Sequence, residues 1–181
     1  MKLIEDMIDA TIGKEGGYSN NPADRGGETM WGITKWVARQ NGYLGKMSAM
    51  PRSVAEQIYR SEYVMKPGFD VVAVTYPKVG AELFDSGVNL GQRWPCLWLQ
   101  MALNAFNNQG KLYPDIDEDG DIGPATIRSL QSYAAERGPA GEAVLLKALN
   151  CLQGARYIDL ARGRSANETF IYGWIDKRVE L

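Results

Sequence analysis

Apolar residues at helical spacing are the feature of this 181-residue sequence that most limits its fold. The first such segment has its apolar residues at Leu3, Ile4, Met7, Ile8 and Ile12. Acidic residues occupy the opposite face, and Gly16 and Gly17 end the pattern, so Glu15 is expected at the C-terminal end of the first helix. Strand signals are weak, which predicts an all-α fold with a small β-hairpin near residues 18–30 as the one candidate for β structure.

Local start signals predict most of the other helices. Ser53 and Glu56 have the spacing of a capping box, and proline suits the first position of a helix because it has no N–H to leave unpaired. Residues 18–32 are rich in Asn, Pro, Asp and Gly, and we interpret them as an ordered loop or short hairpin. The expected helices cover residues 33–42, a segment from Ser53 through Tyr63, 77–90, 95–106, a segment from Pro124 through Leu130, about 139–162, and the surroundings of Phe170, Trp174 and Val179.

The sequence contains no histidine, and this absence excludes several kinds of active site. Ser-His-Asp and Cys-His nucleophile pairs need an imidazole, and so do the His-rich zinc sites of metalloproteases and amidases. Proton transfer must then depend mainly on carboxylates with shifted pKa values, or less often on Lys, Tyr or Cys. Twenty basic and 22 acidic residues leave a net charge of −2, which argues against a nucleic-acid partner.

The N-terminal segment lacks the features of a secretion signal. Glu5, Asp6 and Asp9 interrupt the apolar stretch that a signal peptide needs, and no later run of apolar residues has membrane-spanning length. We therefore expect synthesis in the cytoplasm without a signal peptide, and no stable insertion into a membrane.

Glu15 and Asp24 are candidates for chemistry by paired carboxylates. Hydrolysis of a glycosidic bond needs an acid to protonate the leaving oxygen, and commonly a second carboxylate that activates water or attacks the anomeric carbon. Apolar packing and the C-terminal end of a helix both raise the pKa of a carboxyl group, so Glu15 is suited to donate a proton. Asp24 lies in a polar, glycine-rich loop and ionises more easily.

The motif around Glu15 has a long and specific pattern, followed by a second motif further along the chain. Its parts are Glu15-Gly16-Gly17-Tyr18, Asn21-Pro22-x-Asp24, Gly26-Gly27-x-Thr29, Gly32-Ile33-Thr34 and Phe84-Asp85-x-x-Val88-Asn89-x-Gly91. This pattern resembles the signature of glycoside hydrolase family 108, the N-acetylmuramidases of phage-endolysin and secretion-activator type. The second motif is similar to the family's second conserved helix, which faces the cleft.

Residues from about 93 onward carry a different set of motifs. These are Leu99-Gln100, Leu103-Asn104, Asp119-Gly120-x-Ile122-Gly123-Pro124-x-Thr126 and Gly173-Trp174. They resemble the predicted peptidoglycan-binding domain that usually ends proteins of this family. The two resemblances imply a lysozyme-like helical muramidase domain over residues 1–92 and a helical peptidoglycan-binding domain over residues 93–181, packed against it.

The resemblance implies hydrolysis of the β-1,4 bond between N-acetylmuramic acid and N-acetylglucosamine in peptidoglycan glycan strands. Glu15 would be the general acid and Asp24 an assisting carboxylate or water positioner, with no cofactor. The protein would act in the periplasm or cell wall after export by a holin or another partner, in wall lysis or in wall remodelling for secretion. Two rival functions stay open: a lytic transglycosylase, and a non-catalytic wall-binding module that serves secretion.

Four residues are predicted substrate contacts: Tyr18, Thr29, Trp31 and Asn89. Tyr18 and Trp31 can stack on sugar rings or pack around the loop. Thr29 falls one residue closer to Asp24 than the threonine of phage-type lysozymes does, so Asp24 and Thr29 either hold a water molecule or only shape the loop. Asn89 and Asp85 share a helical face, on which Asp85 is the better candidate for a structural tether.

The remaining polar and sulfur-containing residues are given structural interpretations. Asp115 to Asp121 has the first half of an EF-hand loop, but its twelfth position is Thr126 in place of a bidentate Glu. We predict no metal site there, and interpret this segment as a polar turn that caps the helix beginning at Pro124. Cys96 and Cys151 are predicted to be buried free thiols, with a disulfide between them as the alternative.

Overall fold

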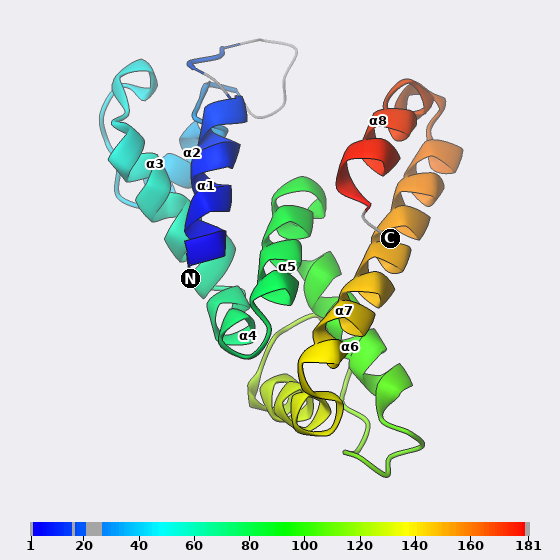
Figure 1. Ribbon diagram of the computed structural model, residues 1–181. Coiled ribbons are helices and arrows are strands. Elements are labelled where there is room, and N and C mark those ends of the chain that lie inside the picture. Colours follow the sequence, from blue (N-terminus) through cyan, green and yellow to red (C-terminus); the bar gives the residue numbers. More distant parts are fainter. Residues whose placement is uncertain (1, 16, 21–26, 180–181) are drawn as a thin grey trace. The chain divides into compact units, whose positions relative to one another are not determined.

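The chain folds into two compact units, which are described separately below. The computed structural model describes residues 2–15, 17–20 and 27–179, without the side chains of residues 14 and 15. The units are Met1–Lys66 and Pro67–Leu181. Helices dominate both units, and a two-stranded hairpin accompanies them, so the prediction of an all-α fold with a small hairpin is confirmed (Figure 1).

Helix α1 (Lys2–Glu15) carries the apolar stripe that the sequence predicts. Ile4, Ile8 and Ile12 are buried along one side of the helix, because residues four apart lie on the same face. This face contributes to the core of the first unit, where α1 contacts α3 (Arg52–Ile58). The helix ends at Glu15, at the position expected from the glycines that follow it in the sequence.

The hairpin consists of β1 (Thr29–Met30) and β2 (Ile33–Thr34), which pair antiparallel. Trp31 and Gly32 form its turn with φ values of 56° and 75°. Two positive φ angles are what a tight two-residue hairpin turn requires, although a tryptophan rarely adopts one. An isolated bridge joins Ser19 to Thr29, so the expected hairpin near 18–30 is present, but its paired strands lie at 29–34.

Three helical segments complete the first unit. Thr34 caps α2 (Lys35–Gln40), where its Oγ1 accepts a hydrogen bond from Val37 N at 3.3 Å. A short 3₁₀ turn, η1 (Met47–Ala49), precedes α3, which continues directly into the π-helix η2 (Tyr59–Met65).

The predicted capping box at Ser53 is wrong. Helix α3 begins at Arg52, and its N-cap is Pro51, which has no capping hydrogen bond from a side chain. The Glu56 carboxylate accepts a hydrogen bond from Arg52 Nε at 2.9 Å, so it forms an ion pair on the helix surface in place of a cap.

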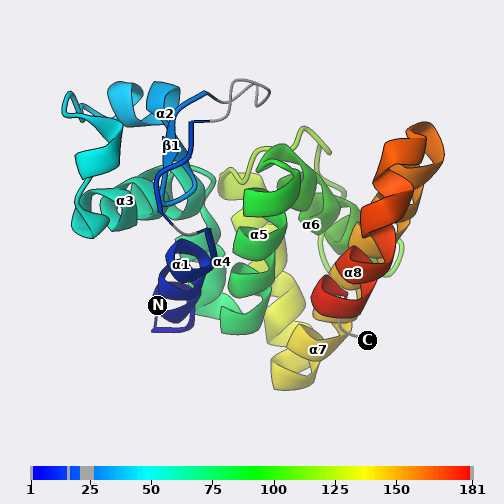
Figure 2. The ribbon, with the colours of Figure 1, turned by 90° about the horizontal axis from the view of Figure 1, so that it is seen from above.

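The second unit is built from five α-helices and a short 3₁₀ turn, as far as its residues are described. Helix α4 was not expected from the sequence, whereas α5 and α6 match the predicted segments closely. Their order is α4 (Phe69–Thr75), α5 (Pro77–Leu90), α6 (Arg93–Phe106), α7 (Pro124–Gly163), η3 (Ser165–Asn167) and α8 (Glu168–Arg178). Helices α5 and α6 lie side by side and both contact α7 (Figure 2). Their shared core includes Phe69, Leu83, Phe84, Leu99, Leu103 and Leu130.

Helix α7 changes direction at Gly138 (Figure 1). This kink agrees with the sequence, which predicts two separate helices, one beginning at Pro124 and one at about Pro139. Gly138 has φ 59° and ψ −155°, a backbone conformation outside the helical region. The Tyr76 hydroxyl donates to Gly138 O at 2.7 Å, and the Tyr133 hydroxyl donates to Gly141 O at 3.0 Å. These two bonds pair carbonyl groups at the kink with side chains, so the bend is fixed by the fold.

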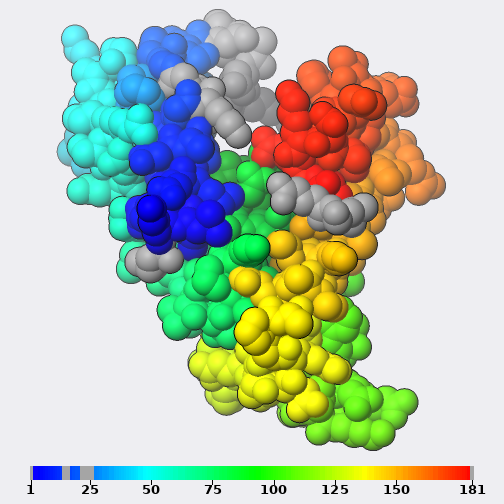
Figure 3. Space-filling view, in the orientation of Figure 1, coloured from blue at the N-terminus to red at the C-terminus, as the bar shows by residue number. Residues whose placement is uncertain are grey.

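Helix α8 packs on the C-terminal part of α7 (Figure 3). The rings of Tyr157 and Trp174 lie with their centroids 5.4 Å apart at this contact. Both cysteines are free thiols; Cys96 is buried as predicted, but Cys151 is exposed, so the prediction of burial is wrong for Cys151. Across the described ranges, no helix combines the length and apolar character needed to cross a membrane.

Candidate active site

The side chains of the two predicted catalytic carboxylates, Glu15 and Asp24, lie outside the described part of the chain. The backbone of α1 runs through Glu15, so this residue lies at the C-terminal end of a helix, but its side chain is outside the described part of the chain. Asp24 also lies outside the described residues. The catalytic roles of Glu15 and Asp24 therefore stay predictions. The distances and hydrogen bonds given below are those of the residues around them.

Glu28 connects residues on both sides of the predicted site loop. Its Oε1 accepts a hydrogen bond from the Tyr18 hydroxyl at 2.9 Å, and its Oε2 accepts one from Lys35 Nζ at 2.6 Å. Ser19 and Thr29 exchange two backbone hydrogen bonds of 3.0 and 2.8 Å beside this cluster. These hydrogen bonds thus join the residues before the segment that contains Asp24 to the residues after it.

The electrostatics of this cluster fix the charge state of its members. The hydrogen bond from Lys35, and next the one from Tyr18, hold the pKa of Glu28 below its usual range. The hydrogen bond to Glu28 raises the pKa of Tyr18, because the acceptor favours the protonated phenol. Glu28 is therefore an anion and Tyr18 a neutral donor at neutral pH. We name Tyr18, Glu28 and Lys35 the hairpin clamp.

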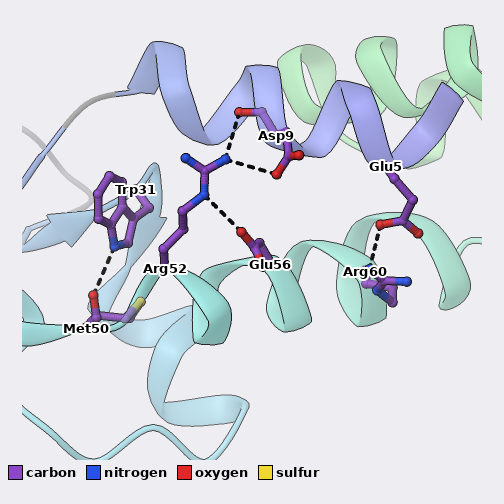
Figure 4. Close-up of polar contacts among 7 residues, drawn as sticks. All are labelled: Glu5, Asp9, Trp31, Met50, Arg52, Glu56 and Arg60. Atoms are coloured by element: carbon purple, nitrogen blue, oxygen red, sulfur yellow. Dashed lines mark hydrogen bonds and ion pairs between the residues drawn. The ribbon is translucent and has the colours of Figure 1, made fainter. Parts of the chain in front are cut away.

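Trp31 anchors the turn of the hairpin to neighbouring elements. Its indole N–H donates to Met50 O at 3.0 Å (Figure 4), and its own carbonyl accepts a hydrogen bond from the Tyr59 hydroxyl at 3.2 Å. These two contacts support the packing interpretation of Trp31. Its ring is half-buried, so the predicted stacking on a sugar stays a prediction.

Ion pairs hold α1 against the helices below it (Figure 4). Arg52 in α3 pairs with Asp9 of α1 at 2.9 Å and with Glu56 of its own helix at 2.9 Å. Arg60 in η2 pairs with Glu5 at 2.5 Å. Such exposed pairs add little stability individually, but they fix the direction of the helix that ends at Glu15.

Asp85 and Asn89 lie on α5 in the second unit, where they contact each other. Asn89 Nδ2 donates to Asp85 O at 2.7 Å and to Asp85 Oδ2 at 3.3 Å. Asp85 also pairs with Arg178 of α8 at 3.2 Å. The preferred interpretation of Asp85 as a tether thus agrees with the structure, and its partner lies in α8. Tyr18, Thr29 and Trp31 lie in the first unit, whereas Asn89 belongs to the second.

The hairpin clamp contains two polar residues that sequence reasoning missed, Glu28 and Lys35. The available signal was the position of Glu28 directly before Thr29, at the end of the predicted loop. Its partners lie ten residues before and seven residues after it, so no local spacing rule identifies them.

The acidic turn at 115–121 is held by amide side chains from α6 and from its C-cap residue, Asn107. Gln100 donates to Asp119 at 2.7 Å, Asn104 donates to Glu118 at 3.0 Å, and Asn107 donates to Asp115 at 2.5 Å. Within the ranges described, no three His, Cys, Asp or Glu side chains are grouped to hold a metal ion. Helix α7 begins at Pro124 as expected, but its N-cap Gly123 has no side-chain cap, so the capping role predicted for this turn is wrong.

A solved structure shares the fold of this chain. The structure of Brucella abortus SagA is similar, with a TM-score of 0.67 and 24% sequence identity over 97% of this chain and 89% of that one. At this identity the similarity shows the fold alone. No curated protein matches the sequence significantly.

Family models assign the two halves. Residues 8–91 match the model described as glycosyl hydrolase 108, and residues 94–179 match the one described as a predicted peptidoglycan domain. The compact units divide at residues 66 and 67, so α4 and α5 fall within the hydrolase match but pack with the second unit. The domain boundary at 92 and 93 stays a prediction. The resemblance seen in the sequence is confirmed: one part of the chain matches glycosyl hydrolase 108, and the part that follows matches a predicted peptidoglycan domain.

Proposed function

We propose that this protein is a muramidase that hydrolyses the β-1,4 bond between N-acetylmuramic acid and N-acetylglucosamine in peptidoglycan. The observation that carries the proposal is the match of residues 8–91 to glycosyl hydrolase 108, because this match contains both Glu15 and Asp24. Glu15 acts as general acid, and Asp24 assists as a second carboxylate or positions the attacking water.

The position of Glu15 supports its role as proton donor. The C-terminal end of α1 carries partial negative charge, which raises the pKa of a nearby carboxyl group. The chain has no histidine, so a carboxyl group is the best available acid near neutral pH. The hairpin clamp supports the role of Asp24, because it holds together the two ends of the segment that carries this residue.

The match over residues 94–179 supports peptidoglycan as the substrate. Tyr18, Thr29, Trp31 and Asn89 are the proposed substrate contacts, and the reaction as proposed requires no cofactor. The protein acts in the periplasm or cell wall, where a holin or another export partner delivers it, and it serves wall lysis or secretion.

The test is product analysis of purified sacculi digested by the parent protein and by Glu15→Gln. We expect the parent to release fragments with reducing N-acetylmuramic acid ends, and Glu15→Gln to lose roughly 10²-fold or more in rate, as the loss of a general acid requires. Asp6→Asn is the matched control, since it replaces an exposed carboxylate on the same helix and should keep full activity.

Other results would point to a rival function. Fragments ending in 1,6-anhydromuramic acid would identify a lytic transglycosylase. Equal rates for the parent and Glu15→Gln would remove Glu15 from the chemistry. A parent protein that binds sacculi without releasing fragments would be a wall-binding module without hydrolase activity.

A further inference from the structure

An open groove with a volume of about 450 Å³ lies in the second unit, within the part that matches the peptidoglycan domain. One wall is the N-terminal part of α7, and the other is the segment that follows Leu112. Its lining residues on α7 are Ala125, Arg128, Ser129 and Ser132, and those on the segment are Tyr113, Pro114, Asp115, Ile116 and Asp117. The volume falls in the range of small-molecule and short-peptide sites.

Helix α6 holds the segment wall in a fixed shape. The Asn104 side chain donates to Ile116 O at 2.9 Å and accepts from Ile116 N at 2.9 Å. The Asn107 side chain donates to Asp115, and the Tyr113 hydroxyl donates to Leu103 O at 2.8 Å. The groove is therefore formed before any ligand arrives, which lowers the entropic cost of binding.

The two walls carry charges of opposite sign. Arg128 extends from α7, whereas Asp115 and Asp117 belong to the opposite segment, and all three residues are exposed. Among the residues the structure describes, neither the Arg128 side chain nor the Asp117 side chain has a hydrogen-bond or ion-pair partner. An unpaired guanidinium can bind a carboxylate through two parallel hydrogen bonds, and a carboxylate can accept bonds from an ammonium group.

Two serines of α7, Ser129 and Ser132, also line the groove. Ser129 is only 4% exposed, and it lines the groove from α7. Ser132 lies on the same face of α7, because residues three apart are neighbours on a helix. A serine hydroxyl that lines a groove can donate a hydrogen bond to a polar ligand or accept one from it.

The lining favours a peptide over a sugar. Sugar sites commonly present an exposed aromatic face, but Tyr113 is the one aromatic residue in this lining and is only 6% exposed. Glycan strands carry no ammonium group, whereas the peptide stems of peptidoglycan combine carboxylates with the amino group of a diamino acid. We propose that this groove binds the peptide stems of peptidoglycan, with Arg128 on a carboxylate and Asp117 on the ammonium group.

This inference rests on the proposed function in one respect, the choice of peptidoglycan as the ligand. Binding of the peptide can be measured without hydrolysis of the glycan strand. The probe is the soluble tetrapeptide L-Ala–D-Glu–meso-diaminopimelate–D-Ala, titrated into the full-length protein and followed by calorimetry. We expect Arg128→Ala and Asp117→Asn each to weaken binding by about tenfold, the loss of about 1.4 kcal/mol of binding free energy. Lys147→Ala is the matched control, because it removes an exposed cation from the same helix outside the groove.

Several outcomes would overturn the inference. They are a parent protein that does not bind the tetrapeptide, equal binding by the parent and Arg128→Ala, and displacement of the peptide by a chito-oligosaccharide, which would make the groove a glycan site. A parent that cleaves sacculi but does not bind the peptide would overturn this inference alone. A parent that binds the peptide through Arg128 but does not cleave sacculi would overturn the proposed function alone.

Discussion

Glu28 connects two segments of the candidate site through the two oxygens of one carboxylate. One of its carboxylate oxygens accepts from Tyr18 and the other from Lys35. These partners lie on opposite sides of the segment that contains Asp24. Loss of the Glu28 charge would weaken the hydrogen bonds to Tyr18 and Lys35 together, whereas the backbone bridge between Ser19 and Thr29 does not depend on that charge.

The hairpin clamp predicts a defined dependence on pH. Because the pKa of Glu28 is lowered in the folded protein, the clamp stabilises the fold fully above the ordinary pKa of glutamate, about 4.3. That stabilisation is lost as the pH falls through the lower, folded-state pKa. The ring signals of Tyr18, followed by NMR, should titrate with a midpoint below about 4.3 in the parent.

Two variants test this assignment. In Lys35→Met the midpoint should rise toward the ordinary value, because the hydrogen bond from Lys35 is the largest cause of the shift. In Glu28→Gln the titration should disappear. A parent midpoint at or above the ordinary value, or a titration that persists in Glu28→Gln, would mean that Tyr18 does not sense Glu28.

At the scale of elements, local signals predicted some segments well and others not at all. Helices α1, α5 and α6 have an apolar stripe or an early proline, and these signals act within the helix itself. Helix α4 is short, and its N-cap Gly68 offers no capping side chain, so nothing local marks its start. The bridge from Ser19 to Thr29 also has no local signal, because it is a contact between separate segments.

In the candidate site, too, the sequence predicts features that depend on local signals but not contacts between distant residues. The position of Glu15 at a helix end was predictable, because it follows from the apolar period and the glycines after it. The anchoring of Trp31 to Met50 was not, since the two residues lie 19 positions apart. The same holds for the pairing of Arg60 with Glu5, which are 55 positions apart.

The close contact of α4 and α5 depends on Gly80. A Cβ atom at this position would lie 2.5 Å from Ala73 Cβ, so Gly80→Ala must push the two helices apart. Overpacking costs about 1–3 kcal/mol, and the better helix propensity of alanine recovers up to about 1 kcal/mol. We expect a net loss of roughly 1–2 kcal/mol in the free energy of unfolding, measured by urea denaturation.

The control for this substitution is Gly173→Ala in α8. Nothing lies within 4 Å of a Cβ atom built at Gly173, so helix propensity alone acts there and stability should hold or rise. Equal effects of the two substitutions would show that the approach of α4 to α5 is not tight.

At the scale of the whole molecule, the compact units and the family matches divide the chain at different places. Residues 67–91 belong to the hydrolase match but pack in the second unit, where α5 contacts both α6 and α7. Gln153 of α7 donates to Ser86 of α5 at 2.8 Å, and both side chains are buried. The core of the second unit therefore includes residues from both matches.

Two fragments test whether the chain divides at residues 66 and 67 or at residues 92 and 93. A fragment of residues 67–181 keeps the core of the second unit intact and should melt in one cooperative transition by circular dichroism. A fragment of residues 93–181 lacks α4 and α5 and should lose that transition, because the partners of Leu83 and Phe84 become exposed. Cooperative melting of the shorter fragment at the same temperature would support a domain boundary at 92 and 93.

The ion pair between Asp85 and Arg178 has an evolutionary consequence. Asp85 lies in the hydrolase match and Arg178 in the peptidoglycan match, and the buried pair of Ser86 and Gln153 joins the same two regions. A recombination event at residue 92 would separate both pairs and leave buried polar groups unmatched in the chimera. We therefore expect residues 67–91 to be inherited together with the region that follows them, and exchange of modules among relatives to favour crossovers near residue 66.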